Sequence, residues 1–504
     1  MKEICLVLFI LTMIGVGAYS KKKVKSSNDF LLGDRNMGGW ISAFAYGTSY
    51  FSAVIFIGYA GAQGWEFGVP ITWVGICNAI FGCFLAWKVL AKRTRYMTQR
   101  LDARTMPEFF EKRYESKNMK FIAALIIFVF LVPYTASVYK GLGYILVSSF
   151  NIKFEVAIFC MALLTAVYLL LGGYVATAIN DLIQGIIMIV GCICMVIFVV
   201  KHPNVGGVSN GLQALHQLDP ELTVVFSGGS KTLPLLGLIF MTSFGVWGLP
   251  QMIHKYYAIK DDEAIKKGTI ISTIFALIIG GSAYFTGSLG RLFFIDSTGV
   301  AVMPEATATA SAAEMIIPRM LETALPAALM GIIIVLILSA SMSTLASLVL
   351  VSSSSISIDF IKGFVWSKIS DKQMIILMRV LCFVFVAISY VLAIMNSSTI
   401  VSLMSLSWGV ISGMFLAPYV FGIWWKKTTK TGAWAGFITG GLVMIVGTVL
   451  TNQGLLPSVV TAPVISSLAM IVSCISVPLV SLISTQMSEA HLVKVFGEGE
   501  KLNC

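Results

Sequence analysis

Long apolar runs recur through this chain of 504 residues and constrain its fold more than any other feature. Charged residues make up 12% of the chain, about half of the roughly 25% usual in soluble domains, while apolar residues reach 57%. A water-facing surface cannot be built from that composition. A membrane-spanning helix needs about 20 apolar residues, so the chain has room for roughly a dozen spans. We therefore predict an all-α integral membrane protein with a single transmembrane domain over residues 1–504.

About 13 transmembrane helices are expected. The first apolar run lies within 1–20 and is followed at once by Lys21, Lys22 and Lys23. A signal peptide would carry its basic residues before the apolar run, so we interpret this segment as an uncleaved helix whose N-terminus lies outside. Twelve further spans are predicted at about 38–60, 71–90, 119–148, 154–172, 176–200, 232–258, 268–290, 326–354, 375–396, 399–425, 432–451 and 462–484.

The distribution of basic residues supports this orientation. Thirteen spans that begin outside place the C-terminus in the cytoplasm, and 28 of the 35 Lys and Arg residues lie in segments assigned to that side. The net charge of +11 is thus explained by topology, without a nucleic-acid partner. We expect a multi-pass protein of the cell membrane with no obligate protein partner.

Ionisable residues inside a membrane are costly, and the deep candidates in this sequence are Asp181 and Lys140. Asp181 could cap a helix or bond to a neighbouring helix, or it could bind a cation or a proton. Lys140 could reach the interface, contact a substrate carboxylate, or place a fixed charge near an ion site. The four histidines lie in loops or near helix ends, and no catalytic motif or metal-ligand pattern is present. We predict neither an enzyme nor a cofactor.

Small residues share one face of the span at 326–354. Ala340, Ser343, Thr344 and Ser347 follow the spacing i, i+3, i+4 and i+7 of a helix. Such residues often serve close helix packing. However, a hard monovalent cation prefers oxygen ligands that need not be charged, and hydroxyls together with a free carbonyl provide them.

Helix-breaking residues in two other spans could supply the missing oxygens. In the second span, Gly47 precedes a run of hydroxyl residues and could free the carbonyls of Thr48 and Phe51. Broken backbone at membrane depth survives only where it lines a cavity, and paired breaks point to the central site of a transporter. Breaks five helices apart suggest a five-helix repeat of inverted topology. The seventh span carries the second group: Gly245, Gly248 and Pro250.

Three stretches resemble the sodium:solute symporter family, which includes proline, pantothenate, sialic acid and sugar cotransporters. They are SSNDFLLGDRNMGGWISAFAYGTSYFSA, LGGYVATAINDLIQGIIMIVG and LSASMSTLASLVLVSSSSISIDF. The resemblance implies a leucine-transporter-type core of five plus five inverted helices at 38–200 and 232–425, with one helix before it and two, at 432–484, after it. It also implies uptake of a small organic solute coupled to Na+ by alternating access.

The family's binding residues carry over to particular positions of this sequence. The resemblance implies a sodium site formed by the carbonyls of Thr48, Phe51 and Ala340 and the hydroxyls of Ser343 and Thr344. Some members have a further cation site, which would match Asp181, Ser343 and Ser347 here, although Ala346 stands where such a member has another hydroxyl. The implied solute contacts are Ser52, Tyr134, Ser137, Trp247 and Gln251.

The motifs favour a small carboxylate or an amino acid as the solute. Tyr134 in PYTAS resembles the proline transporters, but Tyr50 and Thr242 depart from their pattern, whereas NDLIQG, GLPQ and LDPEL are more similar to the pantothenate branch. A sugar-type or sialic-acid-type Na+ symporter remains an alternative. Coupling to protons through Asp181 or Lys140 is a second alternative. A membrane sensor built on a transporter core is a third.

Overall fold

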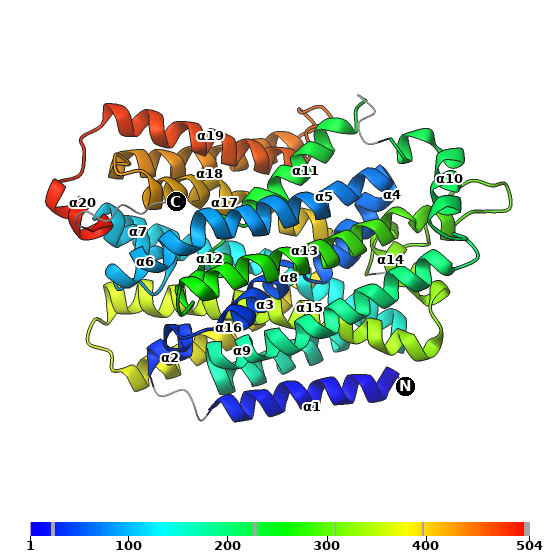
Figure 1. Ribbon diagram of the computed structural model, residues 1–504, viewed down its shortest axis with the longest axis horizontal. Coiled ribbons are helices and arrows are strands. Elements are labelled where there is room, and N and C mark those ends of the chain that lie inside the picture. Colours follow the sequence, from blue (N-terminus) through cyan, green and yellow to red (C-terminus); the bar gives the residue numbers. More distant parts are fainter. Residues whose placement is uncertain (1, 22–25, 225–228, 308, 396–397, 498–504) are drawn as a thin grey trace.

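The computed structural model describes residues 2–21, 26–224, 229–307, 309–395 and 398–497. These residues are almost entirely helical, and the extended pairing among them is limited to two isolated bridges, Met37 with Ile259 and Ile295 with Ala301. The helices lie side by side in one elongated bundle (Figure 1). The predicted all-α class is thus confirmed.

The described part of the chain contains twenty α-helices and eight π-helical or 3-10 segments. The α-helices are α1 (Lys2–Lys21), α2 (Ser27–Leu32), α3 (Gly39–Tyr50), α4 (Gly64–Phe67), α5 (Thr72–Cys77), α6 (Lys92–Arg100), α7 (Met106–Tyr114), α8 (Lys117–Phe150), α9 (Phe154–Lys201), α10 (Val208–Leu218), α11 (Thr232–Gly245), α12 (Pro250–Tyr257), α13 (Asp262–Ser288), α14 (Ala312–Ala324), α15 (Ala327–Ser354), α16 (Asp371–Met395), α17 (Ile400–Trp424), α18 (Lys430–Asn452), α19 (Ala462–Ile483) and α20 (Glu489–Phe496). The π-helical segments are η2 (Val54–Gln63), η4 (Asn78–Leu85), η5 (Trp87–Ala91) and η8 (Ser355–Val365), and the 3-10 turns are η1 (Gly33–Arg35), η3 (Val69–Ile71), η6 (Pro220–Leu222) and η7 (Gly290–Phe293).

Eleven helices of the described chain are long and apolar enough to cross a membrane. The count rises to twelve when Gly39–Tyr50 and Val54–Phe67, which meet at a 47° bend, are taken as one span. The span predicted at 154–172 is present as the shorter apolar stretch Phe154–Val167, which a kink at Gly173 separates from the rest of α9. The prediction of many helices long enough to span a membrane is confirmed, whereas the number thirteen stays a prediction.

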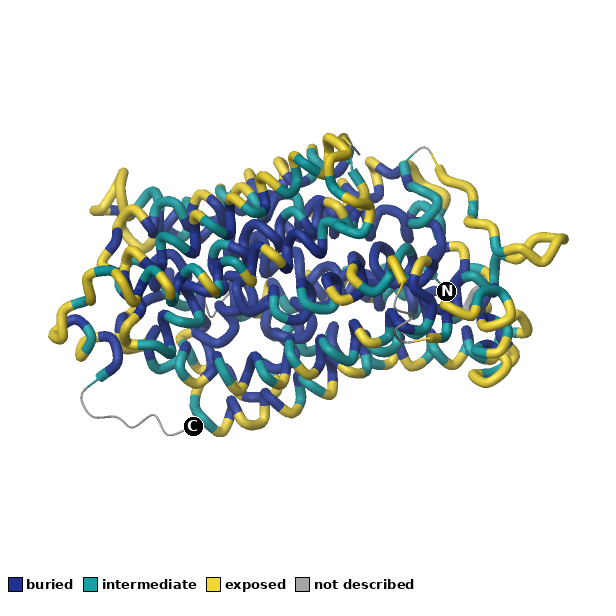
Figure 2. Tube along the Cα trace, turned by 90° about the horizontal axis from the view of Figure 1, so that it is seen from above, coloured by how far each residue is buried: buried dark blue, intermediate teal, exposed yellow. Residues whose placement is uncertain are grey.

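The bundle has a buried centre between two flanking groups of helices. Helix α1 lies along α9 at one edge, and α18 and α19 pack on α17 at the opposite edge (Figure 1). Buried residues fill the interior, while exposed residues gather at the ends and on the outer helices (Figure 2). Helix α15 belongs to the centre: 94% of its most apolar stretch is buried by the protein itself. Its small polar side chains therefore face other helices and not lipid.

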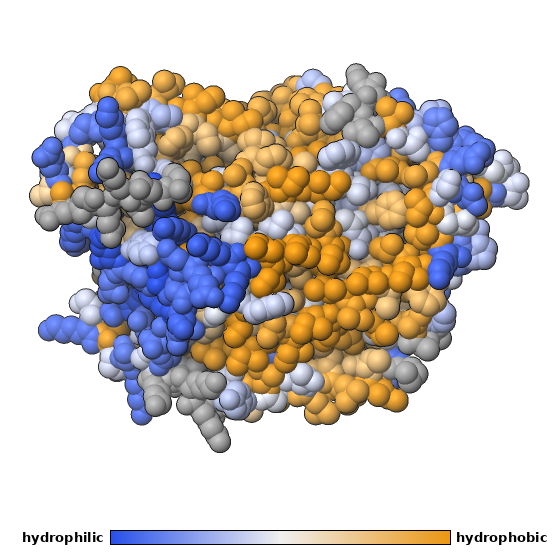
Figure 3. Space-filling view, viewed as in Figure 1, coloured by the Kyte–Doolittle hydropathy of each residue, from blue (hydrophilic) through white to orange (hydrophobic). Residues whose placement is uncertain are grey.

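Hydropathy varies along the long axis of the bundle. Apolar side chains cover the middle of the face shown in Figure 3, and polar side chains gather most densely at the end where α6 and α7 lie. An apolar band between polar ends is the surface that a bilayer requires.

The first helix break lies four residues later than predicted. Helix α3 continues through Gly47 to Tyr50, and the extended residue at the break is Phe51 (φ −106°, ψ 114°). Gly47 serves packing instead, because a Cβ atom there would lie 2.4 Å from the ring of Phe275. The chain resumes as η2 at Val54. The prediction of a break at Gly47 was therefore wrong in position, although the second span is broken.

The second break lies where the sequence predicted it. Helix α11 ends at Gly245 and α12 begins at Pro250, whose missing N–H is not needed at the first position of a helix. Gly248 lies in the turn between them and faces α17. A Cβ atom there would be 2.9 Å from the backbone nitrogen of Leu416 and from the Cα of Ser412.

Candidate ion and solute site

Oxygen atoms from two helices meet where α3 ends against α15. The Thr344 hydroxyl lies 3.3 Å from the carbonyl oxygen of Thr48, 3.4 Å from that of Ser49 and 3.1 Å from that of Ala340. The Ser343 hydroxyl donates to Oγ1 of Thr48 over 2.7 Å. All of these residues are buried. Four residues that the sequence predicted for a sodium site thus lie together, and we name Thr48, Ala340, Ser343 and Thr344 the hydroxyl cluster.

The end of α3 explains why oxygens accumulate here. The last four carbonyls of a helix have no partner within it, and α3 stops at Tyr50 in the middle of the protein. The amide of Phe51 takes the Gly47 carbonyl at 3.2 Å, and the carbonyls of Thr48 and Ser49 turn to Thr344. Such uncharged, buried oxygens can replace the water shell of a monovalent cation. Phe51, the remaining predicted ligand, is the extended residue at the break, and its ring stacks on Tyr50.

Asp181 reaches the hydroxyl cluster from α9. Its carboxylate lies beside the hydroxyls of Ser343 and Thr48, and its Oδ2 accepts a hydrogen bond from the Lys255 ammonium over 3.2 Å. Its Oδ1 is buried and has no hydrogen-bond partner among the described residues. The third residue predicted for a second cation, Ser347, pairs its hydroxyl with that of Ser49 at 2.9 Å.

The sequence analysis did not name Lys255 among the deep charges, although it lies in the span predicted at 232–258. The structure buries it in α12, because this helix packs against α3, α6, α7 and α15. Lysine at the start of the basic region 255–267 looks like an interface residue in sequence. One available signal was its spacing of four residues from Gln251, which places both side chains on the same face of the helix.

Lys140 lies apart from this ion pair. It is buried, its ammonium donates to the carbonyl of Ser398, and it lies 5.9 Å from the ring centre of Tyr144. The structure thus holds Lys140 against the segment that leads into α17 and not at an exposed interface.

An aromatic cluster connects the two helix breaks. Tyr134 of α8 packs edge-to-face on Trp408 of α17, with ring centres 5.9 Å apart, and Tyr50 stacks on the same indole at 6.3 Å. Trp408 also abuts Gly245, where a Cβ atom would lie 3.1 Å from its ring. Ser52 lies near the Tyr134 hydroxyl. The sequence analysis missed Trp408, since one Trp in an apolar span carries no distinguishing pattern.

The other predicted solute contacts are Gln251, Trp247 and Ser137, and they differ in whether the protein already satisfies their polar atoms. Gln251 is buried, and both polar atoms of its amide lack a hydrogen-bond partner within the described chain. Buried amides are normally satisfied, so a polar ligand group could complete this one. Trp247 donates from its indole N–H to the carbonyl of Phe81 over 3.0 Å and so faces η4. The hydroxyl of Ser137 is used inside α8, on the carbonyl of Tyr134.

Comparison with known proteins identifies the family of this chain. The sequence model of the sodium:solute symporter family matches residues 30–440. The chain belongs to the sodium:solute symporter family. Among curated relatives, the osmoregulated proline transporter OpuE of Bacillus subtilis is 28% identical over 507 residues, covering 99% of this chain and 98% of the relative. The sodium/proline symporter of Escherichia coli is 28% identical over 444 residues, covering 87% and 86%.

Solved structures share the fold of this chain. A Na+-coupled sialic acid symporter in a substrate-bound outward-open state superposes with a TM-score of 0.80 at 19% identity, covering 97% of this chain and 99% of that one. MHP1, a nucleobase-cation-symport-1 family transporter in a closed conformation, gives a TM-score of 0.52 at 13% identity, with 93% and 98% covered.

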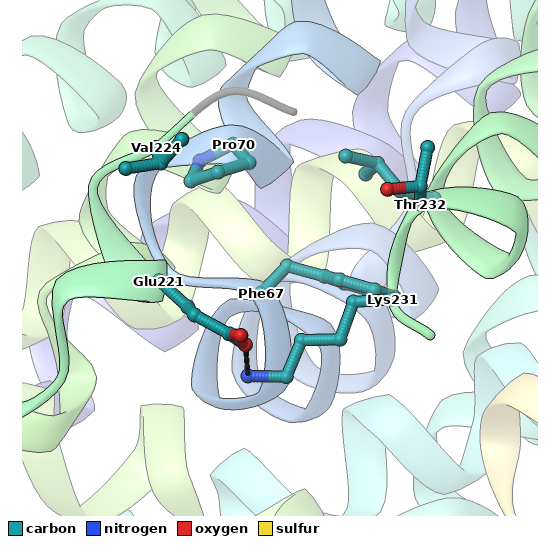
Figure 4. Close-up of a pocket in the computed structure, with 7 residues that line it drawn as sticks. Phe67, Pro70, Glu221, Val224, Lys231 and Thr232 are labelled. Atoms are coloured by element: carbon teal, nitrogen blue, oxygen red, sulfur yellow. Dashed lines mark ion pairs between the residues drawn. The ribbon is translucent and has the colours of Figure 1, made fainter. Parts of the chain in front are cut away.

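Two pockets in the described part of the chain are lined by residues other than the hydroxyl cluster and the predicted solute contacts. The pocket in Figure 4 contains the Glu221–Lys231 ion pair, with 3.3 Å between charged atoms, and is lined by Phe67, Pro70, Glu221, Val224, Lys231, Thr232 and Leu235. A larger pocket of about 250 Å³ is lined by Tyr144, Val147, Ser148, Asn151, Thr307, Thr309, Met315 and Arg319. By contrast, Ser52, Tyr134 and Gln251 are each only 1% exposed, so the predicted solute contacts are closed to solvent.

Proposed function

We propose that this protein is a secondary active transporter that couples Na+ entry to the uptake of a small organic solute by alternating access. The observation that carries the proposal is the contact of the Thr344 hydroxyl with the carbonyls of Thr48 and Ser49. An ion bound there would join α15 to the broken end of α3 and so hold the adjoining solute contacts in place. The proposed sodium ligands are Thr48, Phe51, Ala340, Ser343 and Thr344.

The sodium gradient provides enough energy for this work. One positive charge gains about 2.3 kcal/mol per 100 mV of membrane potential. A tenfold concentration gradient adds about 1.4 kcal/mol. The sum of about 3.7 kcal/mol could sustain roughly 500-fold accumulation of a neutral solute at one-to-one coupling.

The proposed solute is an amino acid or a carboxylate, with proline and pantothenate as the first candidates. Two curated relatives that match along most of their length are named as proline transporters, which supports proline. Tyr134 and Trp408 offer an apolar surface, and Gln251 offers an unsatisfied amide, as expected for a small solute with one polar end. A sugar or sialic acid is the alternative, favoured by the fold shared with a sialic acid symporter.

The topology belongs to the same proposal. We place the protein in the cell membrane with its N-terminus outside and its C-terminus in the cytoplasm, because the basic residues concentrate in the segments on that side. The inverted repeats would span 38–200 and 232–425, each containing one helix break.

Uptake by proteoliposomes tests the proposal and identifies the solute. Vesicles with equal pH on both sides receive labelled L-proline, pantothenate, sialic acid or glucose under an inward Na+ gradient, with K+ replacing Na+ as the control. We expect one of the first two to accumulate only with Na+. Uptake driven by an inward pH gradient without Na+ would instead establish proton coupling, and no dependence on either gradient would overturn the symporter proposal.

A further inference from the structure

A buried ion pair stands next to the proposed sodium ligands. Lys255 of α12 and Asp181 of α9 approach to 3.2 Å between Nζ and Oδ2, and their side chains are 2% and 1% exposed. Burying two charges costs several kcal/mol each before their attraction is counted, so such a pair is poor evidence for stability. Its position beside Ser343 and Thr48 points to a role in ion binding.

The Asp181 carboxylate could bind a cation, but it is already paired with the positively charged ammonium of Lys255. Its carboxylate adjoins the hydroxyl cluster, and its Oδ1 carries no hydrogen bond from any described residue. The other carboxylate oxygen, Oδ2, already binds the Lys255 ammonium. The same ammonium lies 5.4 Å from the ring centre of Tyr174, whose face also favours a positive charge. Lys255 is therefore held on two sides as a bound cation would be.

We propose that the Lys255 ammonium is a resident cation for Asp181, so that the chain binds one Na+ and not two. This inference rests on the proposed sodium coupling and specifies its stoichiometry. Asp181 and Lys255 together are neutral, and one Na+ on the hydroxyl cluster adds a single positive charge to the buried region. A second Na+ would add another positive charge close to the ammonium without a further carboxylate to balance it, and like charges repel strongly in so dry a place.

The Lys255–Asp181 ion pair also connects α12 to α9, two helices that hold none of the proposed sodium ligands. The proposed ligands belong to α3, to the break after it and to α15, whereas Lys255 binds α12, which follows the second break, to α9. Ser343 donates to Thr48 and lies beside the Asp181 carboxylate, so the ion pair and the proposed sodium ligands adjoin at this residue. The ammonium therefore gives α12 a fixed attachment that does not depend on a second ion.

Direct counting of bound sodium tests the proposal. The purified full-length protein in detergent is equilibrated with ²²Na+ alone, and the number of ions per chain and the dissociation constant are measured. Lys255→Met removes the charge at similar length, Lys255→Arg keeps it, and Asp181→Asn combined with Lys255→Met removes both members. We expect one ion for the wild type, two for Lys255→Met, one for Lys255→Arg and one for the double variant.

Two results would overturn the resident-cation proposal: two ions on the wild type, or a single ion on folded Lys255→Met. Should Lys255→Met fail to fold, Asp181→Asn replaces it. That variant leaves an unbalanced ammonium near the ion, so its dissociation constant for Na+ should rise at least about tenfold. An unchanged constant would contradict the proposal. No bound sodium on the wild type would instead refute the sodium site itself, which separates the two claims.

Discussion

The two helix breaks of this protein are closed in different ways. After α3, the carbonyls of Thr48 and Ser49 face the single hydroxyl of Thr344, which comes from another helix. After α11, the chain closes on itself through amides that donate to carbonyls three residues back, Trp247 to Phe244 and Gly248 to Gly245. The oxygens at the first break therefore depend on the position of α15, whereas the backbone hydrogen bonds of the second lie within its own turn. Only the first is suited to sense an ion that joins two helices.

The second break also has one hydroxyl from a neighbouring helix, which provides a matched comparison. Ser412 of α17 donates to the Gly245 carbonyl over 2.6 Å. Thr344 and Ser412 are both buried hydroxyls that serve a carbonyl at the end of a broken helix. Removing the Thr344 hydroxyl should alter the sodium dependence of uptake, and removing the Ser412 hydroxyl should not.

Thr344→Ala should have the largest effect. Losing an oxygen that contacts a charge costs about 1.5–3 kcal/mol, which corresponds to a rise of roughly 10-fold to 100-fold in the sodium concentration for half-maximal uptake. The measurement is solute uptake against Na+ concentration in proteoliposomes. Thr269→Ala is the control, because that buried hydroxyl donates to the carbonyl of Ile265 in its own helix. Unchanged sodium dependence in Thr344→Ala would refute the site.

Gly248→Ala should destabilise the second break without changing its chemistry. The added methyl group would press on the backbone of α17, since it would lie 2.9 Å from Leu416 N. Overpacking of this kind costs about 1–3 kcal/mol. We expect a lower melting temperature and less uptake, with the half-saturating Na+ concentration unchanged. Gly281→Ala, where no atom lies within 4 Å of the new methyl group, should behave as wild type.

Ser412→Ala should have a smaller effect. It removes one neutral hydrogen bond, worth about 1 kcal/mol, and should lower the melting temperature slightly. Sodium titrations of uptake should match those of the wild type. A shift as large as that of Thr344→Ala would show that the two breaks do not differ as described.

The smallest effect concerns pH. Both breaks are closed by uncharged groups, so the acid sensitivity of stability should arise elsewhere, for example at Glu108 in α7. Burial raises the pKa of Glu108, but Arg104 and Lys120 more than offset it and hold the pKa below the ordinary value of 4.5. The ionised form is therefore the stabilising one. Above the ordinary pKa of 4.5, the melting temperature of Glu108→Gln should lie about 2 °C below that of the wild type. This difference should disappear as the pH falls through the lowered pKa of Glu108. A difference that persists in acid would contradict this.

The sequence predicted the hydroxyl face well because helical spacing fixes which residues share a side. Ser343, Thr344 and Ser347 all reach α3 from α15. The position of the first break was less accessible, since glycine permits either a break or a close contact, and Gly47 provides the contact.

Lys255 and Trp408 escaped prediction for a different reason. Their roles follow from which helices surround them, and the pattern along one helix does not contain that information. A lysine at a helix end is normally an interface residue. Only the packing of α12 against α3 and α15 turns Lys255 into a buried counter-ion.

Cotransport of the ion itself tests the central claim most directly. In proteoliposomes at equal pH, an inward gradient of the transported solute should drive ²²Na+ into the vesicles, with one ion entering per solute molecule. Thr344→Ala, measured at the wild type's half-saturating Na+ concentration, should lose most of this coupled entry. Solute entry without ²²Na+, or coupled entry that Thr344→Ala leaves intact, would contradict the account.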